Sequence, residues 1–158
     1  MSNQERIQTK ASKMKTLKIG KNLSEWSAYS CQLKTKEELE QIIKDRISKE
    51  GLNCDLNDID VSQITDMSLL FYKSEFNGDI SRWNVSNVKS MYCMFAYSNF
   101  NGDISKWNVC NTKDMSYMFE ISKFNQNILS WKINKNCDTV HMFERCPIKE
   151  EYKPVLPE

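Results

Sequence analysis

The 158-residue chain is 40% hydrophobic and 27% charged, with a net charge of +1, a composition that excludes a wholly disordered protein. Its length fits one domain with at most a small attachment. It contains no run of about 18 apolar residues that would predict a transmembrane helix, and its polar start lacks the apolar stretch of a signal peptide. We therefore expect a cytoplasmic, non-membrane protein whose six cysteines are mostly reduced.

The first segment, residues 1–34, is predicted to be a basic and partly ordered arm. Residues 1–36 contain eight Lys or Arg residues against two acidic residues. Such a charge excess attracts nucleic-acid phosphates, although it does not identify a partner. The lysines that would make these contacts are Lys10, Lys13, Lys15, Lys18 and Lys21.

Residues 35–51 are predicted to form a capping helix. Thr35 and Glu38 have the spacing of a capping box at a helix start. Gly51 stands where a glycine often ends a helix. The apolar face of this helix, which we expect to cover the end of the next region, consists of Leu39, Ile42, Ile43 and Ile47.

Residues 52–148 contain four copies of a 24-residue unit. The segments FNGDISRWNVSNVKSMYCMF and FNGDISKWNVCNTKDMSYMF are near copies of each other, and weaker copies precede and follow them in the same register. One unit is too short to bury its own apolar side chains, so the units must stack. Residues 149–158 follow as a polar C-terminal tail.

These features predict an α+β repeat solenoid of four coils with an N-terminal capping helix. Within the second unit, the apolar residues of 80–85 are two or three positions apart and β-branched or aromatic, which favours a short strand. The three- and four-residue spacings of 88–95 favour one or two helical turns. Asn77 and Gly78 predict a tight turn. Neighbouring coils are then expected to pair as parallel strands.

Recurring polar residues are interpreted as structural. Asp79 and Asp103 share one position of the repeat, where a carboxylate can satisfy backbone N–H groups at a corner but can also bind calcium or act in acid–base catalysis. The tryptophans at 83, 107 and 131 are expected to form a core row rather than a platform for stacking bases. An asparagine ladder is predicted from Asn53, Asn77, Asn101 and Asn125.

Nothing in the sequence predicts an enzyme, a metal site or a cofactor. His141 is the only histidine and occupies a variable position of the repeat. Cys93 shares that position two coils away, which is too far for a catalytic hydrogen bond. The chain also contains no Cys-x-x-Cys pair of the kind that holds zinc.

The outward positions that differ between coils are the candidate partner site. Core rows must repeat, whereas surface rows are free to vary. Tyrosine and arginine are typical anchors of protein interfaces, although the same positions are also suited to simple solvation. The predicted partner-binding residues are Tyr92, Tyr97, Tyr117, Arg82, Lys106, Glu120 and Arg145.

The two near-identical segments resemble the BspA-like leucine-rich-repeat proteins, and more narrowly the repeat of unknown function common in mycoplasma and other bacterial surface lipoproteins. The resemblance covers residues 35 to about 148. It implies a leucine-rich-repeat-like solenoid that binds other proteins or cell surfaces, as a bacterial adhesin does.

These observations favour a protein–protein interaction module. By analogy with small inhibitors encoded by mobile elements, it would bind and mask one macromolecule, either a protein or a ribonucleoprotein. The alternatives are a nucleic-acid-binding protein that uses the basic arm and a bacterial surface adhesin.

Overall fold

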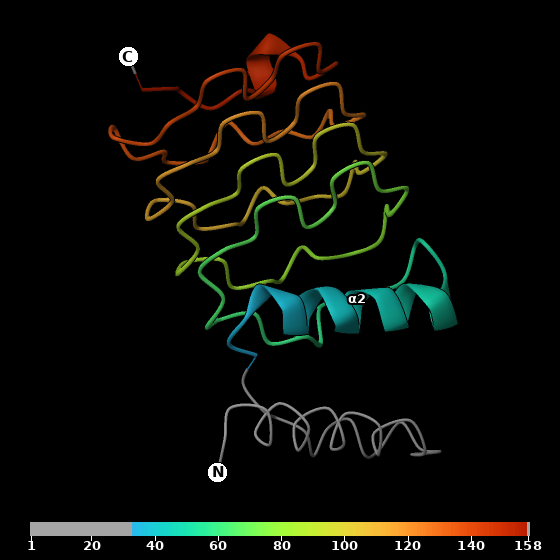
Figure 1. Cartoon of the computed structure of the whole chain (residues 1–158). Helices are drawn as coiled ribbons and strands as arrows, with labels where there is room; N and C mark the ends of the chain where they lie inside the picture. The colour runs from blue at the N-terminus through green and yellow to red at the C-terminus, as the bar shows by residue number, and fades with distance from the viewer. Residues whose placement is uncertain (1–32, 158) are drawn as a thin grey trace. The chain divides into compact units, whose positions relative to one another are not determined.

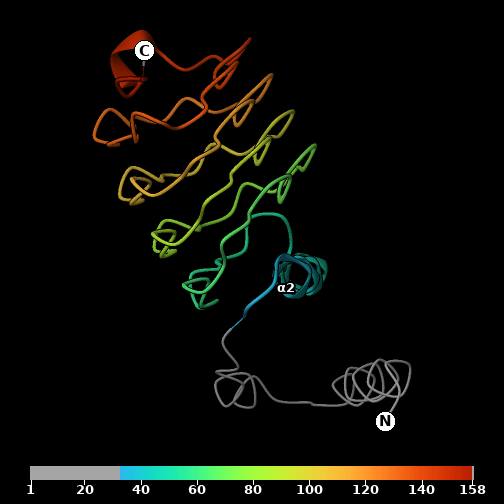
Figure 2. The same ribbon diagram turned by 60° about the vertical axis from the view of Figure 1, so that its left-hand side comes forward.

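The computed structural model describes residues 33–157 of the chain. Helix α2 spans Lys36–Glu50, and the short 3-10 helix η3 spans Glu150–Tyr152. Between them the chain winds through coils that lie one above another (Figures 1 and 2). We number the coils by their sequence units, which are 52–75, 76–99, 100–123 and 124–147.

Helix α2 begins and ends as its sequence predicts. The backbone N–H of Glu38 donates to Thr35 Oγ1 at 3.2 Å, and the Glu38 carboxylate accepts from the Thr35 N–H at 3.3 Å. This reciprocal pair satisfies two backbone donors that a helix start otherwise leaves unpaired. Gly51 follows the last turn with φ of 92°, and its N–H donates to the Ile47 carbonyl. The predicted capping box is therefore confirmed.

The helix covers the core of coil one. Leu39 and Ile43 are buried in the same apolar cluster as the side chains of the coils. Arg46 fixes the helix at its far end, because its guanidinium donates to Asp58 Oδ2 at 2.7 Å and to the Asp55 carbonyl at 2.9 Å. Asp58 and Glu50 in turn raise the pKa of Arg46.

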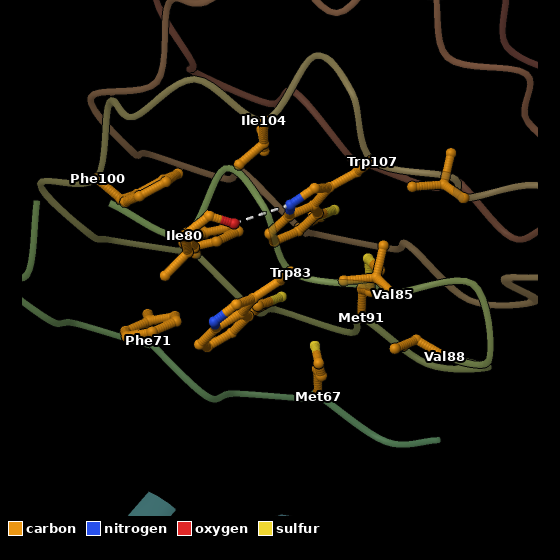
Figure 3. Close-up of a cluster of buried hydrophobic side chains, with 14 of the residues drawn as sticks. Met67, Phe71, Ile80, Trp83, Val85, Val88, Met91, Phe100, Ile104 and Trp107 are labelled. Carbon is orange, nitrogen blue, oxygen red and sulfur yellow. Dashed lines mark hydrogen bonds between the residues drawn. The ribbon is translucent and has the colours of Figure 1, made fainter. Parts of the chain in front are cut away.

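Equivalent side chains of successive coils stack into continuous buried rows. The rings of Phe71 and Phe95 are 5.5 Å apart and almost parallel. Those of Trp83 and Trp107 are 6.5 Å apart at an interplanar angle of 5°, as Figure 3 shows. Aromatic pairs of this kind stabilise a fold by about 0.5–1.5 kcal/mol beyond their buried area. The 24-residue register predicted from the sequence is thus confirmed in the packing.

Each tryptophan also ties its coil to the one before it. The indole N–H of Trp107 donates to the Ile80 carbonyl at 3.1 Å (Figure 3). Trp83 and Trp131 make the same bond to the carbonyls of Leu56 and Ile104. All three indoles are only 4% exposed. They are core residues, and a base-stacking role for this row is wrong.

The backbone of the coils differs from the expected strands and helical turns. Within residues 33–157, pairing of the β type is limited to isolated parallel bridges, such as Asp66 with Ser90. The segment 80–85 contains a turn and no strand, and 88–95 contains consecutive turns and no helix. The predicted α+β solenoid of parallel strands, leucine-rich-repeat-like in type, is therefore wrong: the fold is a stack of irregular, turn-rich coils.

Left-handed residues explain why the apparent helical segment is not a helix. Cys93 and Tyr97 have positive φ angles of 51° and 59°, which a right-handed helix excludes. Successive backbone N–H groups of this segment bond alternately to the next coil and within a turn. The Cys93 N–H donates to the Ser116 carbonyl of the next coil, whereas the Met94 N–H closes a turn on Met91.

Two structural roles predicted for polar side chains, at the corners and in the asparagine ladder, are confirmed at most positions of the repeat. Asp79 Oδ1 accepts from the Ser81 N–H at 2.9 Å, and Asp103 Oδ1 accepts from the Ser105 N–H at 2.9 Å. The corner role of these aspartates is confirmed. In the ladder, Asn101 donates its N–H to Asn77 Oδ1, Asn125 to Asn101 Oδ1, and Lys149 to Asn125 Oδ1. Asn53 is outside the ladder, because the Asn77 N–H donates to the Leu52 carbonyl instead.

Gly78 is required by a close approach rather than by a tight turn. A Cβ atom on Gly78 would lie 2.1 Å from the Cys54 carbonyl oxygen and 2.7 Å from the Phe76 ring. At Gly102 the nearest atoms are those of the Phe100 ring, at 2.8 and 2.9 Å. The expected turn at Asn77 and Gly78 is absent from the structure.

We expect Gly78→Ala to lower the free energy of unfolding by about 3 kcal/mol, because a backbone carbonyl must move to admit the methyl group. Gly102→Ala is the matched control and should cost about 1 kcal/mol, because an aromatic ring can shift. Urea unfolding of both variants measures the difference. Equal losses would contradict the close-approach explanation.

Acid should weaken the corners. The nearby Asn57 amide and the hydrogen bond from the Ser81 N–H lower the pKa of Asp79, so this carboxylate stabilises the fold above its unfolded pKa of about 3.9. The contribution is lost as the pH falls through the lower folded-state pKa. Asn127 occupies the same corner of coil four and accepts from the Leu129 N–H at 3.0 Å. Asp79→Asn should therefore keep the corner and lose less stability than the wild type between about pH 5 and pH 3, as measured by urea midpoints. An unchanged pH slope would count against a titrating corner.

Candidate protein-interaction surface

Four segments of the coils, 67–74, 91–98, 115–122 and 139–146, run side by side. Four N–H groups of coil one, on residues 67, 69, 71 and 73, donate to carbonyls of coil two at 2.9 to 3.0 Å. The same pattern joins coil two to coil three and coil three to coil four. These lateral bonds hold the four segments in one register, and we call them the lateral ladder.

Each ladder segment has two pairs of positions between its inward residues, and most of these positions are exposed or half-buried. In coil two the inward residues are Met91, Met94 and Phe95, which are fully buried. The pairs between them are 92–93 and 96–97, and the second residue of each pair has positive φ. Tyr92 and Tyr97 are exposed, whereas Cys93 and Ala96 are buried. We define the recognition face as the exposed and half-buried residues at these positions of the four coils, which are 68–69, 72–73, 92, 97, 117, 120–121, 140–141 and 144–145.

Tyrosines from adjacent coils meet on this face. The rings of Tyr72 and Tyr97 are 5.8 Å apart at an angle of 77°. The ammonium group of Lys73 lies 5.1 Å from the first ring centre and 5.7 Å from the second, within the range of a cation–π attraction. This group of three holds exposed aromatic side chains in a defined arrangement.

A second aromatic row crosses coils two to four. Tyr92 lies 6.1 Å from Tyr117, and Tyr117 lies 5.1 Å from His141. His141 Nδ1 is 2.5 Å from Glu144 Oε2, which fixes the imidazole at the end of the row. Cys93 raises the pKa of the Tyr92 hydroxyl, and burial raises the pKa of Cys93 itself. Both groups are therefore protonated at neutral pH.

The structure brings five of the predicted partner-binding residues together and leaves two elsewhere. Arg82 and Lys106 share a position in another segment of the coil. Arg82 lies 3.7 Å from Asp55 Oδ2 of the preceding coil and outside the ladder. Their binding role stays a prediction without a structural link to the tyrosines. The five on the recognition face are Tyr92, Tyr97, Tyr117, Glu120 and Arg145.

Sequence reasoning missed several exposed apolar residues of the face. Leu69, Tyr72 and Val140 are 43%, 38% and 53% exposed. Many positions vary between coils, so variation alone does not identify these three residues. Their position in the repeat could have identified them, because each lies in a pair of residues beside the inward Met and Phe rows.

The part of the chain that the structure describes offers no group of three His, Cys, Asp or Glu side chains suited to a metal ion. Cys54, Cys93, Cys110, Cys137 and Cys146 are free thiols, and burial raises the pKa of Cys137 to about 11. No helix in that part is long and apolar enough to span a bilayer. The five arm lysines predicted to contact nucleic acid lie outside the described residues.

Stacked units with an invariant core and a variable outward face define a repeat protein that displays a surface. The chain belongs to the family described as "Mycoplasma protein of unknown function, DUF285", which matches residues 37–153. This match confirms the mycoplasma-type resemblance but not the wider BspA-like leucine-rich-repeat assignment. No curated protein and no solved structure matches the chain.

Residues of the recognition face with positive φ lower the free energy of unfolding by a measurable amount. Ile121 has φ of 50°, and a β-branched residue in this conformation is a genuine outlier. Asparagine tolerates it, so Ile121→Asn should raise the free energy of unfolding by about 1 kcal/mol. Ile133→Asn is the control: Ile133 packs against the core and has no positive φ, so its loss should destabilise. Urea unfolding distinguishes the two, and a destabilised Ile121→Asn would show that side-chain contacts outweigh the strain.

Proposed function

We propose that this chain is a protein-interaction module and that the recognition face binds its macromolecular partner. The observation that carries the proposal is the gathering of Tyr72, Tyr92, Tyr97 and Tyr117 from three coils on one rigidly hydrogen-bonded surface. Aromatic side chains held in place contribute contact area at little cost in conformational entropy, which is why they dominate interface energetics.

The proposal extends to a mode of action. A small, continuous surface suits a protein that masks one target, either a protein or a ribonucleoprotein, in the cytoplasm. It assigns no catalytic role to the chain. The resemblance of the repeat to those of bacterial surface lipoproteins suggests a surface adhesin as the second candidate, and adhesion would use the same exposed face.

The first experiment identifies the partner and then measures its affinity. The tagged chain is used to capture partners from a lysate, and mass spectrometry names the stoichiometric ones. With the purified partner, we expect Tyr92→Ala, Tyr97→Ala and Tyr117→Ala each to weaken binding by about 1–2 kcal/mol, because each removes a partly exposed aromatic anchor.

Lys135→Ala is the matched control. Lys135 is exposed and belongs to another segment of the coils, so its removal should leave the affinity unchanged. Partner binding that survives all three tyrosine substitutions would refute the recognition face. Capture of nucleic acid that collapses with added salt and with deletion of residues 1–22 would favour the basic arm instead.

A further inference from the structure

Among the described residues, the lateral ladder ends in coil four with backbone N–H donors that have no acceptor. In coil three, the equivalent N–H groups of Tyr117, Phe119 and Ile121 donate to the next coil at 2.9 Å. Within residues 33–157, no hydrogen bond is made by the corresponding N–H groups of coil four. These groups belong to His141, Phe143 and Arg145.

The C-terminal tail covers only part of coil four at the C-terminal end of the stack. Ile148 is buried and continues the position of Phe124. The Ile128 N–H donates to the Tyr152 carbonyl at 3.0 Å. The tail thus acts as the first part of a further coil and then departs from its path. The Lys153 ammonium lies 5.7 Å from the Phe143 ring centre, but no further ladder segment lies beside 139–145 among the described residues.

A cavity of about 530 Å³ lies where that neighbour would sit. Phe143 is partly exposed there, whereas Phe71, Phe95 and Phe119 of the same row are buried to within 1%. The C-terminal tail forms the far wall of the cavity, and its Val155 is 83% exposed. The cavity residues are Thr139, His141, Met142, Phe143, Glu150, Lys153, Pro154, Val155 and Leu156.

The positive charge of Arg145 indicates which side chains a docked segment would carry beside the cavity. In the ladder the N–H of Tyr97 donates to the Glu120 carbonyl of the next coil. Arg145 occupies the position of Tyr97 in coil four. A segment docked in register would place its equivalent of Glu120 next to Arg145 and above Glu144, whose carboxylate pairs with His141. Within the described residues Arg145 has no carboxylate partner. An acidic residue at that point would provide one.

We propose that this open edge binds an extended polypeptide segment of a partner protein, which lies on coil four as a further coil would. Alternate carbonyls of the segment accept from His141, Phe143 and Arg145. An apolar side chain enters the cavity, and an acidic side chain pairs with Arg145. Extended peptides bind other folds in the same manner, through main-chain bonds and alternate side-chain pockets. This site adjoins the recognition face and shares His141 and Arg145 with it, but its main-chain donors and its cavity do not rest on that proposal.

The test uses a peptide copied from the chain itself. Residues 114–122, Asp-Met-Ser-Tyr-Met-Phe-Glu-Ile-Ser, supply these carbonyls to coil two. We expect the labelled peptide to bind the full chain saturably, and amide exchange at the three donors to slow by about tenfold or more. Arg145→Glu should weaken binding by about tenfold, and a peptide with Lys in place of its Glu should restore it. Tyr92→Ala should bind the peptide normally, so failure here and failure of the recognition face are distinguishable.

Several results would overturn the proposal. They are the absence of saturable binding up to about 1 mM peptide, binding that leaves the three amides unprotected, and indifference to the charge swap. Concentration-dependent self-association that the peptide displaces would also overturn it, because the occupant would then be a second copy. Arg145 is exposed, and circular dichroism of Arg145→Glu checks that the variant folds.

Discussion

The fold depends on lateral hydrogen bonds that join each coil to the next in a fixed register. Met67 bonds to Ser90, Met91 to Asp114 and Met115 to Asp138, so every bond spans one repeat less one residue. This register places like side chains above one another and allows the Phe and Trp rows to stack. One inserted residue within a coil would shift every later side chain out of its row, as a register slip does in a sheet. Core and backbone therefore impose the same repeat length.

The sequence predicted the periodicity and the buried rows because both follow from residue type and spacing. It predicted the helix start at Thr35 because capping is a local interaction. The backbone of the coils could not be predicted in this way. The spacing of Met91, Met94 and Phe95 fits one face of a helix and equally fits a chain of turns. Positive φ at Leu69, Tyr97 or Ile121 has no signal in the sequence, because none of these residues is glycine.

Only part of the candidate site could be predicted, because the sequence does not reveal the path of the backbone. Variation between coils identifies surface positions but not the segment to which they belong. Arg82 was therefore grouped with Tyr92, although the structure places Arg82 beside Asp55. Tyr72 and Leu69 were missed because their exposure follows from left-handed turns that the sequence did not reveal. A site built from several coils becomes visible only when the path of the backbone is known.

The division of labour between inward and outward residues explains how the scaffold tolerates change. Core rows keep Met, Phe and Trp almost without exception, whereas the outward pairs hold residues as different as Tyr, Lys, Glu and Ile. Substitutions on the recognition face leave the stacked rings beneath it untouched. The same backbone can therefore present different chemical surfaces from coil to coil at little cost in stability.

The direction of the ladder bonds has an electrical consequence. In a β-sheet, donors and acceptors alternate along each strand edge, so peptide dipoles largely cancel. Here the intervening N–H groups are used within turns, and every ladder N–H from Met67 to Ile121 points toward the C-terminal end. Their dipoles add along the stack, as they do along a helix. Because bonds in other segments, such as Asn77 to Leu52 and Asn99 to Ser74, run the opposite way, this dipole belongs to the ladder segments alone, with its positive end at coil four and its negative end at coil one.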